Sequence, residues 1–261
     1  MSLPTFDVDV CNGELGALLL PVSLIALAEC DSTNTQLMRL AEEGALSGTV
    51  LVADHQTAGR GRRNRQWMST PQGSLTFSLL WRFVSSSAAP TALSLAVGLG
   101  LQRAMAALGV AAAVKWPNDL LCRDRKLAGV LIETQTGDVK SAVIGIGINI
   151  SLPATLPGDI ARAAISLDEV LPTAPTRERL LGNILAHLLV VLEQYGREGF
   201  AVLREEWQAR HAFENRDIRV GDGNDDLCGI CLGVSATGEL LVRVGDRVHR
   251  VVSGDVSLRP T

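Results

Sequence analysis

The sequence has no strong excess of either charge and no long hydrophobic run. Its 24 Lys and Arg stand against 28 Asp and Glu, a formal net charge of −4, so we expect no general attraction to nucleic acid or to an anionic membrane. The longest apolar stretch, residues 15–28, is interrupted by Pro21 and Ser23 and is shorter than the ~18–20 residues that span a bilayer. Asp7 and Asp9, without an early Lys or Arg, are unlike a signal peptide. These absences predict a cytoplasmic globular protein with no membrane association.

Cysteine is sparse as well. The five cysteines are odd in number and scattered, which argues against a disulfide framework. Cys228 and Cys231 form a C-x-x-C pair, which is typical of half a zinc site or of a redox motif. No second Cys/His pair follows to complete four ligands, and no βαβ pattern surrounds the pair. We therefore interpret the two residues as small apolar side chains in a strand-rich segment, and we assign no metal site.

The common nucleotide-binding signatures are missing too. The chain contains no G-x-x-x-x-G-K-[ST] motif. The glycine pair in GIGIN, residues 145–149, lacks the third glycine and the following helix of a dinucleotide-binding fingerprint. If ATP binds here, neither a Walker loop nor a Rossmann turn holds it.

Hydrophobic periodicity predicts an α+β domain over residues 1–213. Strands are expected over residues 22–30, 49–56 and 74–83, with a run of several over 113–149. Helices are expected over residues 33–43, 90–108, 176–193 and 199–212. Thr33 and Gln36 match a T-x-x-Q capping box. The Pro- and Thr-rich segment 151–175 is expected to be irregular.

The pattern changes near residues 213–215. Short alternating strands follow, broken by Gly-Asp, Asn-Asp and Thr-Gly turns. That pattern is typical of a small antiparallel barrel. We therefore predict a second unit over residues 214–261.

The most distinctive local feature is a glycine- and arginine-rich loop, residues 57–67. It places Arg60, Arg62, Arg63 and Arg65 within six residues. Guanidinium groups suit phosphate and carboxylate because their planar fork donates two parallel hydrogen bonds. Mutual repulsion predicts a loop that is mobile until an anion neutralises it. A solvated basic loop and an RNA-binding arginine stretch remain alternative interpretations of the loop alone.

Two other segments carry polar groups at the ends of predicted elements. In the segment 115–119, KWPND, the proline ends a strand, so Asn118 and Asp119 are expected at a sheet end where polar groups can meet a ligand. An ordinary turn is an equally good interpretation of these residues in isolation. The segment 31–34, DSTN, starts a predicted helix, where a capping role and a ligand contact can coexist.

Taken in order, five segments resemble the biotin protein ligase family. They are DSTN (31–34), QTAGRGRRNRQW (56–67), KWPNDL (115–120), RKLAGVLIE (125–133) and GIGIN (145–149). The resemblance covers about residue 24 to the C terminus, and the arginine loop together with KWPND is its most specific part. It implies a mixed-sheet catalytic domain flanked by helices, of the class II synthetase type, with a C-terminal SH3-like barrel.

The resemblance also implies a two-step reaction. The biotin carboxylate attacks the α-phosphate of ATP, with Mg²⁺, giving biotinyl-5′-AMP and pyrophosphate. A lysine of the biotin carboxyl carrier protein of acetyl-CoA carboxylase then takes the biotin and releases AMP. A homodimer is left open as the assembly.

The resemblance carries residue roles onto this chain. The biotin-binding residues would be Ser32, Thr33, Asn34, Gln56, Arg60, Gly61, Arg62, Lys126 and Gly129. The residues binding ATP or the adenylate would be Arg60, Arg62, Arg63, Arg65, Trp67, Lys126 and Asn149. The catalytic residues would be Lys126, Arg62, Asn118 and Asp119. Within these sets, Lys126 resembles the cation shared by the carboxylate and the α-phosphate, and Asn118 and Asp119 would orient the acceptor lysine or the metal.

The chain departs from the family pattern in two places. Many relatives have a glycine where this loop has Asn64, and Asn tolerates left-handed backbone better than most residues. About 23 residues precede the first predicted strand, which are too few for the DNA-binding winged helix of bifunctional members, so we expect a monofunctional ligase that does not bind DNA. Two alternatives stay open: a lipoate ligase with the same adenylate chemistry, and a nucleic-acid-binding module that uses the arginine loop.

Overall fold

The computed structural model describes residues 5–15, 22–83, 92–135, 141–156, 158–221, 226–252 and 257–260. Seven strands form one mixed sheet: β1 (Ser23–Cys30), β2 (Thr49–Gln56), β3 (Ser74–Arg82), β4 (Ala112–Lys115), β5 (Asp119–Cys122), β6 (Arg125–Gln135) and β7 (Ser141–Asn149). Their order is β1-β2-β3-β7-β6-β5-β4, with β1 and β2 parallel and the other neighbours antiparallel. The predicted α+β class is confirmed.

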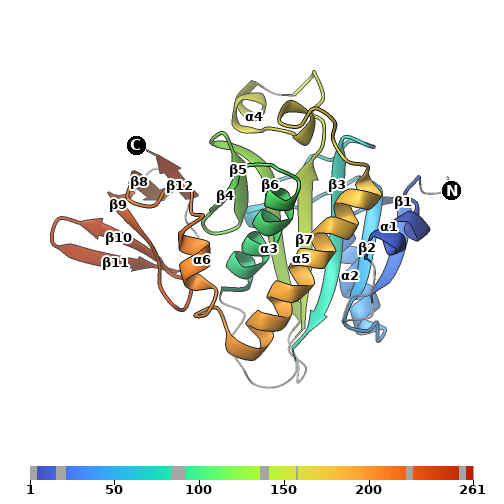
Figure 1. The fold of residues 1–261 in the computed structure, drawn as a ribbon, viewed down its shortest axis with the longest axis horizontal. Helices are drawn as coiled ribbons and strands as arrows, with labels where there is room; N and C mark the ends of the chain where they lie inside the picture. Colours follow the sequence, from blue (N-terminus) through green and yellow to red (C-terminus); the bar gives the residue numbers. More distant parts are fainter. Residues whose placement is uncertain are drawn as a thin grey trace.

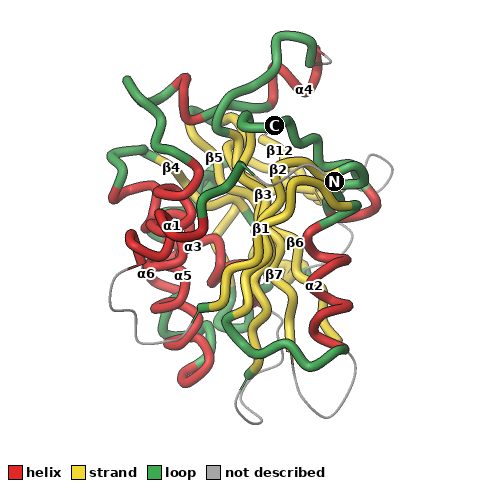
Figure 2. The backbone as a smooth tube through the Cα atoms, turned by 90° about the vertical axis from the view of Figure 1, so that its right-hand side faces the viewer, coloured by secondary structure: helices red, strands yellow, loops and turns green. Residues whose placement is uncertain are grey.

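Helices cover both faces of the seven-stranded sheet, so this part of the molecule has three layers (Figures 1 and 2). The helices are α1 (Val8–Leu15), α2 (Thr33–Glu42), α3 (Leu93–Ala107), α4 (Gly158–Ala163), α5 (Arg177–Glu198) and α6 (Arg204–Gln208). Among the helices of the described ranges, α2 alone lies on one face, where Leu37 and Ala41 pack on Leu51, Leu80 and Val143. The larger core lies on the other face, beneath α3 and α5.

Five strands form the C-terminal unit: β8 (Asp217–Gly221), β9 (Leu227–Val234), β10 (Leu240–Val244), β11 (Arg247–Val251) and β12 (Ser257–Pro260). They make one antiparallel sheet in the order β11-β10-β9-β8-β12. The small antiparallel unit is therefore confirmed, and its closure into an SH3-like barrel stays a prediction. Cys228 is exposed and Cys231 is fully buried on β9. The two thiols therefore lie on opposite faces of the strand.

The predicted helix over 199–212 is wrong in extent, because α6 ends at Gln208. The backbone then turns to pair with the edge strand β4: Val114 N donates to Arg210 O (2.9 Å) and Ala212 N to Val114 O (2.9 Å). These bonds satisfy edge groups of β4 that a longer helix would leave unpaired. The segment thereby connects the seven-stranded sheet directly to the C-terminal sheet.

Two further predictions of local structure were wrong. Segment 151–175 is not wholly irregular, because it contains α4 and a 3₁₀ turn, Leu167–Glu169, whose start has a capping box between Ser166 and Glu169. The capping box expected from Thr33 and Gln36 is absent among the described residues: Ser32 holds the N-cap position, and Gln36 Nε2 donates to Asp31 Oδ1 (2.8 Å).

The sequence also gave no indication of α1. A buried ion pair anchors the segment before it, with Arg177 Nη1 2.7 Å from Asp54 Oδ1. Thr5 N donates to Asp54 Oδ2 (2.6 Å), and Arg177 Nη2 donates to Thr5 Oγ1 (2.9 Å). The N-terminal segment is thus tied to β2 and α5, and α1 itself packs on α5 and β1.

None of the helices in the described ranges has the length and apolarity needed to cross a membrane.

His211 lies between the two sheets and is 8% exposed. Its ring stacks on Trp207 with centroids 4.6 Å apart, and its Nδ1 lies 3.8 Å from Cys231 Sγ. Its Nε2 is buried with no hydrogen-bond partner in the described part of the chain. Burial lowers the pKa of His211 from 6.5 to about 4, since charging the ring would leave a cation in apolar surroundings.

We predict that this histidine makes folding acid-sensitive. The unfolded chain takes up the proton first, so the contribution is complete above pH 6.5 and is lost as the pH falls toward 4. Between pH 7.5 and 4.5 the free energy of unfolding should fall by roughly 2–3 kcal/mol more in the wild type than in His211→Phe. Urea unfolding across this range measures the difference. His249→Phe, at an exposed position, is the control, and equal pH dependence of wild type and His211→Phe would contradict the prediction.

Candidate active site

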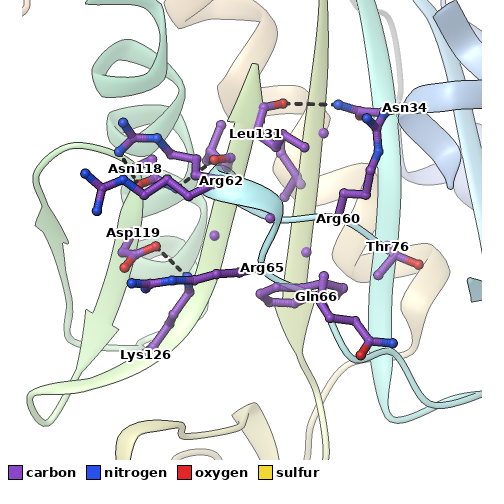
Figure 3. Close-up of a pocket in the computed structure, with 18 of the residues that line it drawn as sticks. Asn34, Arg60, Arg62, Arg65, Gln66, Thr76, Asn118, Asp119, Lys126 and Leu131 are labelled. Atoms are coloured by element: carbon purple, nitrogen blue, oxygen red, sulfur yellow. Dashed lines mark hydrogen bonds and ion pairs between the residues drawn. The ribbon is translucent and has the colours of Figure 1, made fainter. Parts of the chain in front are cut away.

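A cavity of about 220 Å³ opens at one end of β2, β6 and β7, beneath the arginine loop (Figure 3). Three parts of the chain supply most of its lining: the start of α2, the loop 60–67 and the segment 115–119. The lining residues are Ser32, Thr33, Asn34, Gln56, Arg60, Gly61, Arg62, Arg63, Arg65, Gln66, Trp67, Thr76, Lys115, Trp116, Pro117, Asn118, Asp119, Lys126, Gly129, Val130, Leu131, Gly145, Ile146 and Gly147. The structure therefore brings together every site residue predicted from sequence except Asn149.

Charge in this lining is strongly one-sided. Six of its residues are Arg or Lys (Arg60, Arg62, Arg63, Arg65, Lys115 and Lys126), and one, Asp119, is a carboxylate. The whole chain, by contrast, has a net charge of −4. A local excess of cations on an acidic protein is the arrangement that binds a small, highly charged anion.

Four of the cations lie beside carboxylate or amide oxygens, and one of them, Lys115 Nζ, is 3.9 Å from Asp119 Oδ2. Lys126 Nζ forms an ion pair with Asp119 Oδ1 at 2.6 Å, and Arg62 Nη1 donates to Asn118 Oδ1 at 3.3 Å (Figure 3). Arg60 Nη2 lies 2.9 Å from Glu133 Oε2. These contacts place the cations at defined points around the cavity.

The arginine loop forms a hydrogen-bonded hairpin, and its mobility in the absence of an anion stays a prediction. Arg60 and Gln66 form a bridge, Gly61 N donates to Arg65 O (2.7 Å), and Trp67 N donates to Gly59 O (2.9 Å). The hairpin contains a 3₁₀ turn, Arg62–Asn64. Its left-handed residue is Arg63 (φ 57°), which precedes Asn64.

The opposite end of the cavity is polar and neutral. Thr33 N and Thr33 Oγ1 both lie within hydrogen-bond distance of Gln56 Oε1, at 2.8 and 3.1 Å. Ser32, Thr33 and Gln56 are all buried. Because Gln56 Oε1 is occupied, its amide nitrogen is left to meet a ligand oxygen. This end suits a neutral polar group such as a urea.

Trp67 closes the cavity against two paired glycines. Gly129 on β6 lies directly opposite Gly147 on β7. A Cβ on Gly147 would lie 2.3 Å from Trp67 Cε2, and one on Gly129 would lie 3.5 Å from Trp67 Cζ3. The indole therefore lies flat on bare sheet backbone, with Lys126 Nζ 5.8 Å from its ring centroid. Packing therefore explains both glycines of the segment GIGIN: Gly147 leaves room for Trp67, and Gly145 leaves room for Asn34.

Asn149 lies at the end of β7, outside the lining. Its Nδ2 donates to Lys126 O (3.2 Å) and to Ile165 O (3.1 Å). In the structure it therefore supports the backbone of Lys126, and its predicted contact with adenine stays a prediction. Sequence reasoning missed Thr76, Lys115 and Gln66 in the lining, and Glu133 just outside it. Lys115 belongs to the motif KWPNDL and Glu133 to the motif RKLAGVLIE, so both could have been found from the sequence. Thr76 belongs to none of the motifs.

We predict that Gly147→Ala displaces Trp67 and opens the loop, because the added methyl group would overlap the indole. Overpacking of this kind costs about 1–3 kcal/mol. Hydrogen exchange of the amides in residues 59–67 should speed up relative to the rest of the sheet. Gly196→Ala, where a Cβ meets nothing within 4 Å, is the matched control. Unchanged loop exchange in Gly147→Ala would refute this account of Trp67.

Comparison with known proteins agrees with this geometry. Residues 27–149 match the sequence model of the Biotin/lipoate A/B protein ligase family, and residues 215–259 match the Biotin protein ligase C terminal domain. Over 241 residues the chain is 35% identical to the Bifunctional ligase/repressor BirA of Escherichia coli, covering 91% of this chain and 74% of the relative. It is 35% identical over 240 residues to the Biotin–[acetyl-CoA-carboxylase] ligase of Mycobacterium tuberculosis, covering 89% and 88%.

The fold is shared with a solved structure as well. A biotin protein ligase from Aquifex aeolicus, in complex with biotin and ATP, superposes with a TM-score of 0.78 at 30% identity, covering 92% of this chain and 99% of that one. Sequence and structure agree over both the mixed sheet and the C-terminal sheet. The chain belongs to the biotin protein ligase family.

Proposed function

We propose that this chain joins biotin to ATP as biotinyl-5′-AMP and then transfers the biotin to a lysine of a carrier protein. The observation that carries the proposal is the cavity: six Lys and Arg side chains in its lining, a neutral polar group formed by Ser32, Thr33 and Gln56, and an indole. Biotin has a urea at one end and a carboxylate at the other, so the neutral polar group and the cations of the lining match the two ends of the ligand. Its apolar middle would pack against Trp67.

In the proposed binding mode the ureido ring occupies the polar end. The Gln56 amide nitrogen would donate to the ureido oxygen, and hydroxyl oxygens of Ser32 and Thr33 would accept from its N–H groups. Thr33 and Gln56 are already fixed to each other at 2.8 Å. A site fixed in advance loses less conformational entropy on binding.

The cationic end would hold the two groups that must react. A carboxylate and a triphosphate repel each other, and Arg60, Arg62 and Lys126 offset that repulsion. A carboxylate oxygen attacks the α-phosphorus, and the bond from this phosphorus to the oxygen bridging it to the β-phosphorus breaks, releasing pyrophosphate. Preorganised donors of this kind are each worth on the order of 3–4 kcal/mol in the transition state. Backbone N–H groups near Gly61 would add neutral donors.

The second step needs a neutral amine and an acceptor for its proton. The acceptor lysine would attack the acyl carbon of the mixed anhydride, and AMP leaves with the bonding electrons. Asn118 and Asp119 lie at the cavity end of KWPND, and Asp119 is its only carboxylate among the described lining residues. We assign Asn118 to orienting the amine and Asp119 to receiving its proton. Trp67, Arg63, Arg65 and Asn149 would face the nucleotide.

Mg²⁺ fits this site as part of the nucleotide substrate. The described residues contain no cluster of three or more His, Cys, Asp or Glu side chains able to hold a metal, and Asp119 already pairs with Lys126. Mg²⁺ commonly binds through one or two carboxylates and the phosphates of its substrate. Asp119 is the residue of this chain that would meet Mg-ATP, where the ion neutralises phosphate charge.

The acceptor we propose is the biotin carboxyl carrier protein of acetyl-CoA carboxylase, the enzyme named in the Mycobacterium tuberculosis relative. Residues 1–213 would form the catalytic domain and 214–261 the C-terminal domain. A homodimer stays an open expectation. Lipoate is the competing substrate, since the matched family covers both activities, and the match of residues 215–259 to the biotin ligase C-terminal domain favours biotin.

The direct test incubates the purified chain with Mg-ATP, a carrier domain and either biotin or lipoate. Pyrophosphate release and the mass of the carrier are measured. We expect pyrophosphate and a heavier carrier with biotin only. No pyrophosphate with either acid would refute the proposal, and turnover with lipoate alone would support the competing activity.

We predict that Lys126→Ala and Arg62→Ala each reduce adenylate formation by roughly 100-fold or more, with little change in melting temperature. Both side chains are partly exposed in the cavity rather than packed in the core. Arg125→Ala is the control. Arg125 is the cation next to Lys126 in the sequence, but it pairs with Glu169 (2.7 Å), so this variant should keep near wild-type activity. Full activity in either cavity variant would overturn the assigned role.

A further inference from the structure

Glu133 of β6 lies just outside the cavity but contacts one of its cations. Its Oε2 accepts a hydrogen bond from Arg60 Nη2 at 2.9 Å and another from Asn34 Nδ2 at 2.8 Å. The Glu133 side chain is 27% exposed. A single carboxylate oxygen thus joins the arginine loop to the start of α2.

Asn34 is itself fixed from behind. It is 3% exposed, and its Oδ1 accepts from Ser78 Oγ of β3 at 2.6 Å. Gly145 makes this possible, because a Cβ there would lie 2.3 Å from Asn34 Oδ1. Asn34 lines the cavity, but both ends of its amide are engaged by the protein. Asn34 is therefore placed to orient Glu133.

The contact leaves Arg60 available to a ligand. Nη2 uses its two N–H groups on Glu133 and on Thr35 Oγ1 (3.1 Å). A guanidinium has five N–H donors, so Nη1 and Nε remain for an anion as far as the described residues go. Figure 3 shows the Arg60 side chain directed toward Asn34, on the opposite side of the cavity from Lys126.

The placement of the negative charge outside the cavity has a physical advantage. A carboxylate inside it would repel the anionic ligand, as Asp119 does unless Lys126 shields it. Glu133 instead neutralises part of the loop's charge from behind Arg60, which reduces repulsion among the four arginines without occupying the space of the ligand. The bond is charge-assisted on both sides and hence stronger than a neutral one.

We propose that Glu133 is a positioning residue for Arg60, and that Asn34 acts as its support. The Ser78–Asn34–Glu133–Arg60 chain fixes the first arginine of the loop at the cavity rim before ligand arrives. This inference rests on the proposed role of Arg60 in holding the carboxylate and the α-phosphate.

The test is a double-mutant cycle of Glu133→Gln and Arg60→Ala, with kcat/KM for biotin in adenylate formation as the readout. Glu133→Gln keeps the shape and removes the charge, so we expect roughly a 10-fold loss. If Glu133 acts through Arg60, the double variant is no worse than Arg60→Ala alone. Two results would overturn the inference. One is that the losses of kcat/KM in the two single variants add up in the double variant. The other is that Glu133→Gln has wild-type activity while Arg60→Ala is impaired, and in that case the proposed role of Arg60 still holds.

A second readout does not depend on activity. Glu133→Gln should speed hydrogen exchange of the loop amides 59–67 without ligand, while exchange in β3 and β7 stays unchanged. Unchanged loop exchange counts against the inference even if the chain forms no adenylate. Glu206→Gln is the matched control, because Glu206 pairs with Arg103 at similar exposure outside the cavity lining. If Glu133→Gln does not fold, Glu133→Asp replaces it in both measurements, because the side chain that is shorter by one methylene withdraws the carboxylate from Arg60 and should give losses in the same direction.

Discussion

Repulsion among six cations in one small cavity is the constraint on which the rest of the site depends. Two like charges about 6 Å apart in surroundings of effective dielectric near 20 repel by roughly 3 kcal/mol. Side-chain oxygens of three residues contact these cations and offset the repulsion. Asp119 and Asn118 lie in the cavity wall, and Glu133 lies just outside it. Each counter-group belongs to the sheet region rather than to the loop. The loop is therefore shaped by the sheet on which it lies.

The sheet in turn accommodates the loop because glycines leave side-chain-free positions on β6 and β7. Gly129 and Gly147 face each other on β6 and β7, so a broad, side-chain-free surface is available to the indole of Trp67. Gly145, two residues before Gly147, makes room for the Asn34 amide. Strand glycines normally weaken a sheet because they pack nothing. Here the neighbouring elements fill the space, so the cost is offset by contacts that build the site.

The sequence predicted the local elements well where local physics determines them. The strand over residues 49–56 was found at the predicted residues, because its apolar side chains are buried on both faces. Most of the cavity lining was also predictable, because the motifs contain it, but Thr76 lies outside every motif. The residue at which α6 ends was not predictable from the sequence, because residues 210–212 pair with β4, a strand almost a hundred residues earlier. The partners of Asn34 and Arg60 were missed for the same reason: Glu133 is 99 and 73 residues away from them, respectively.

The indole of Trp116 extends the site into the C-terminal sheet. It is fully buried, and its Nε1 donates to Gly238 O, in the turn between β9 and β10, at 3.0 Å. The next three residues are Pro117, Asn118 and Asp119, so the Trp116 side chain links a distal turn to residues of the cavity lining. Residues 27–149 and 215–259, which match two separate sequence models, are thus joined here by a direct buried hydrogen bond. A substitution in that turn, remote from any ligand, acts on the same strand end that presents Asp119.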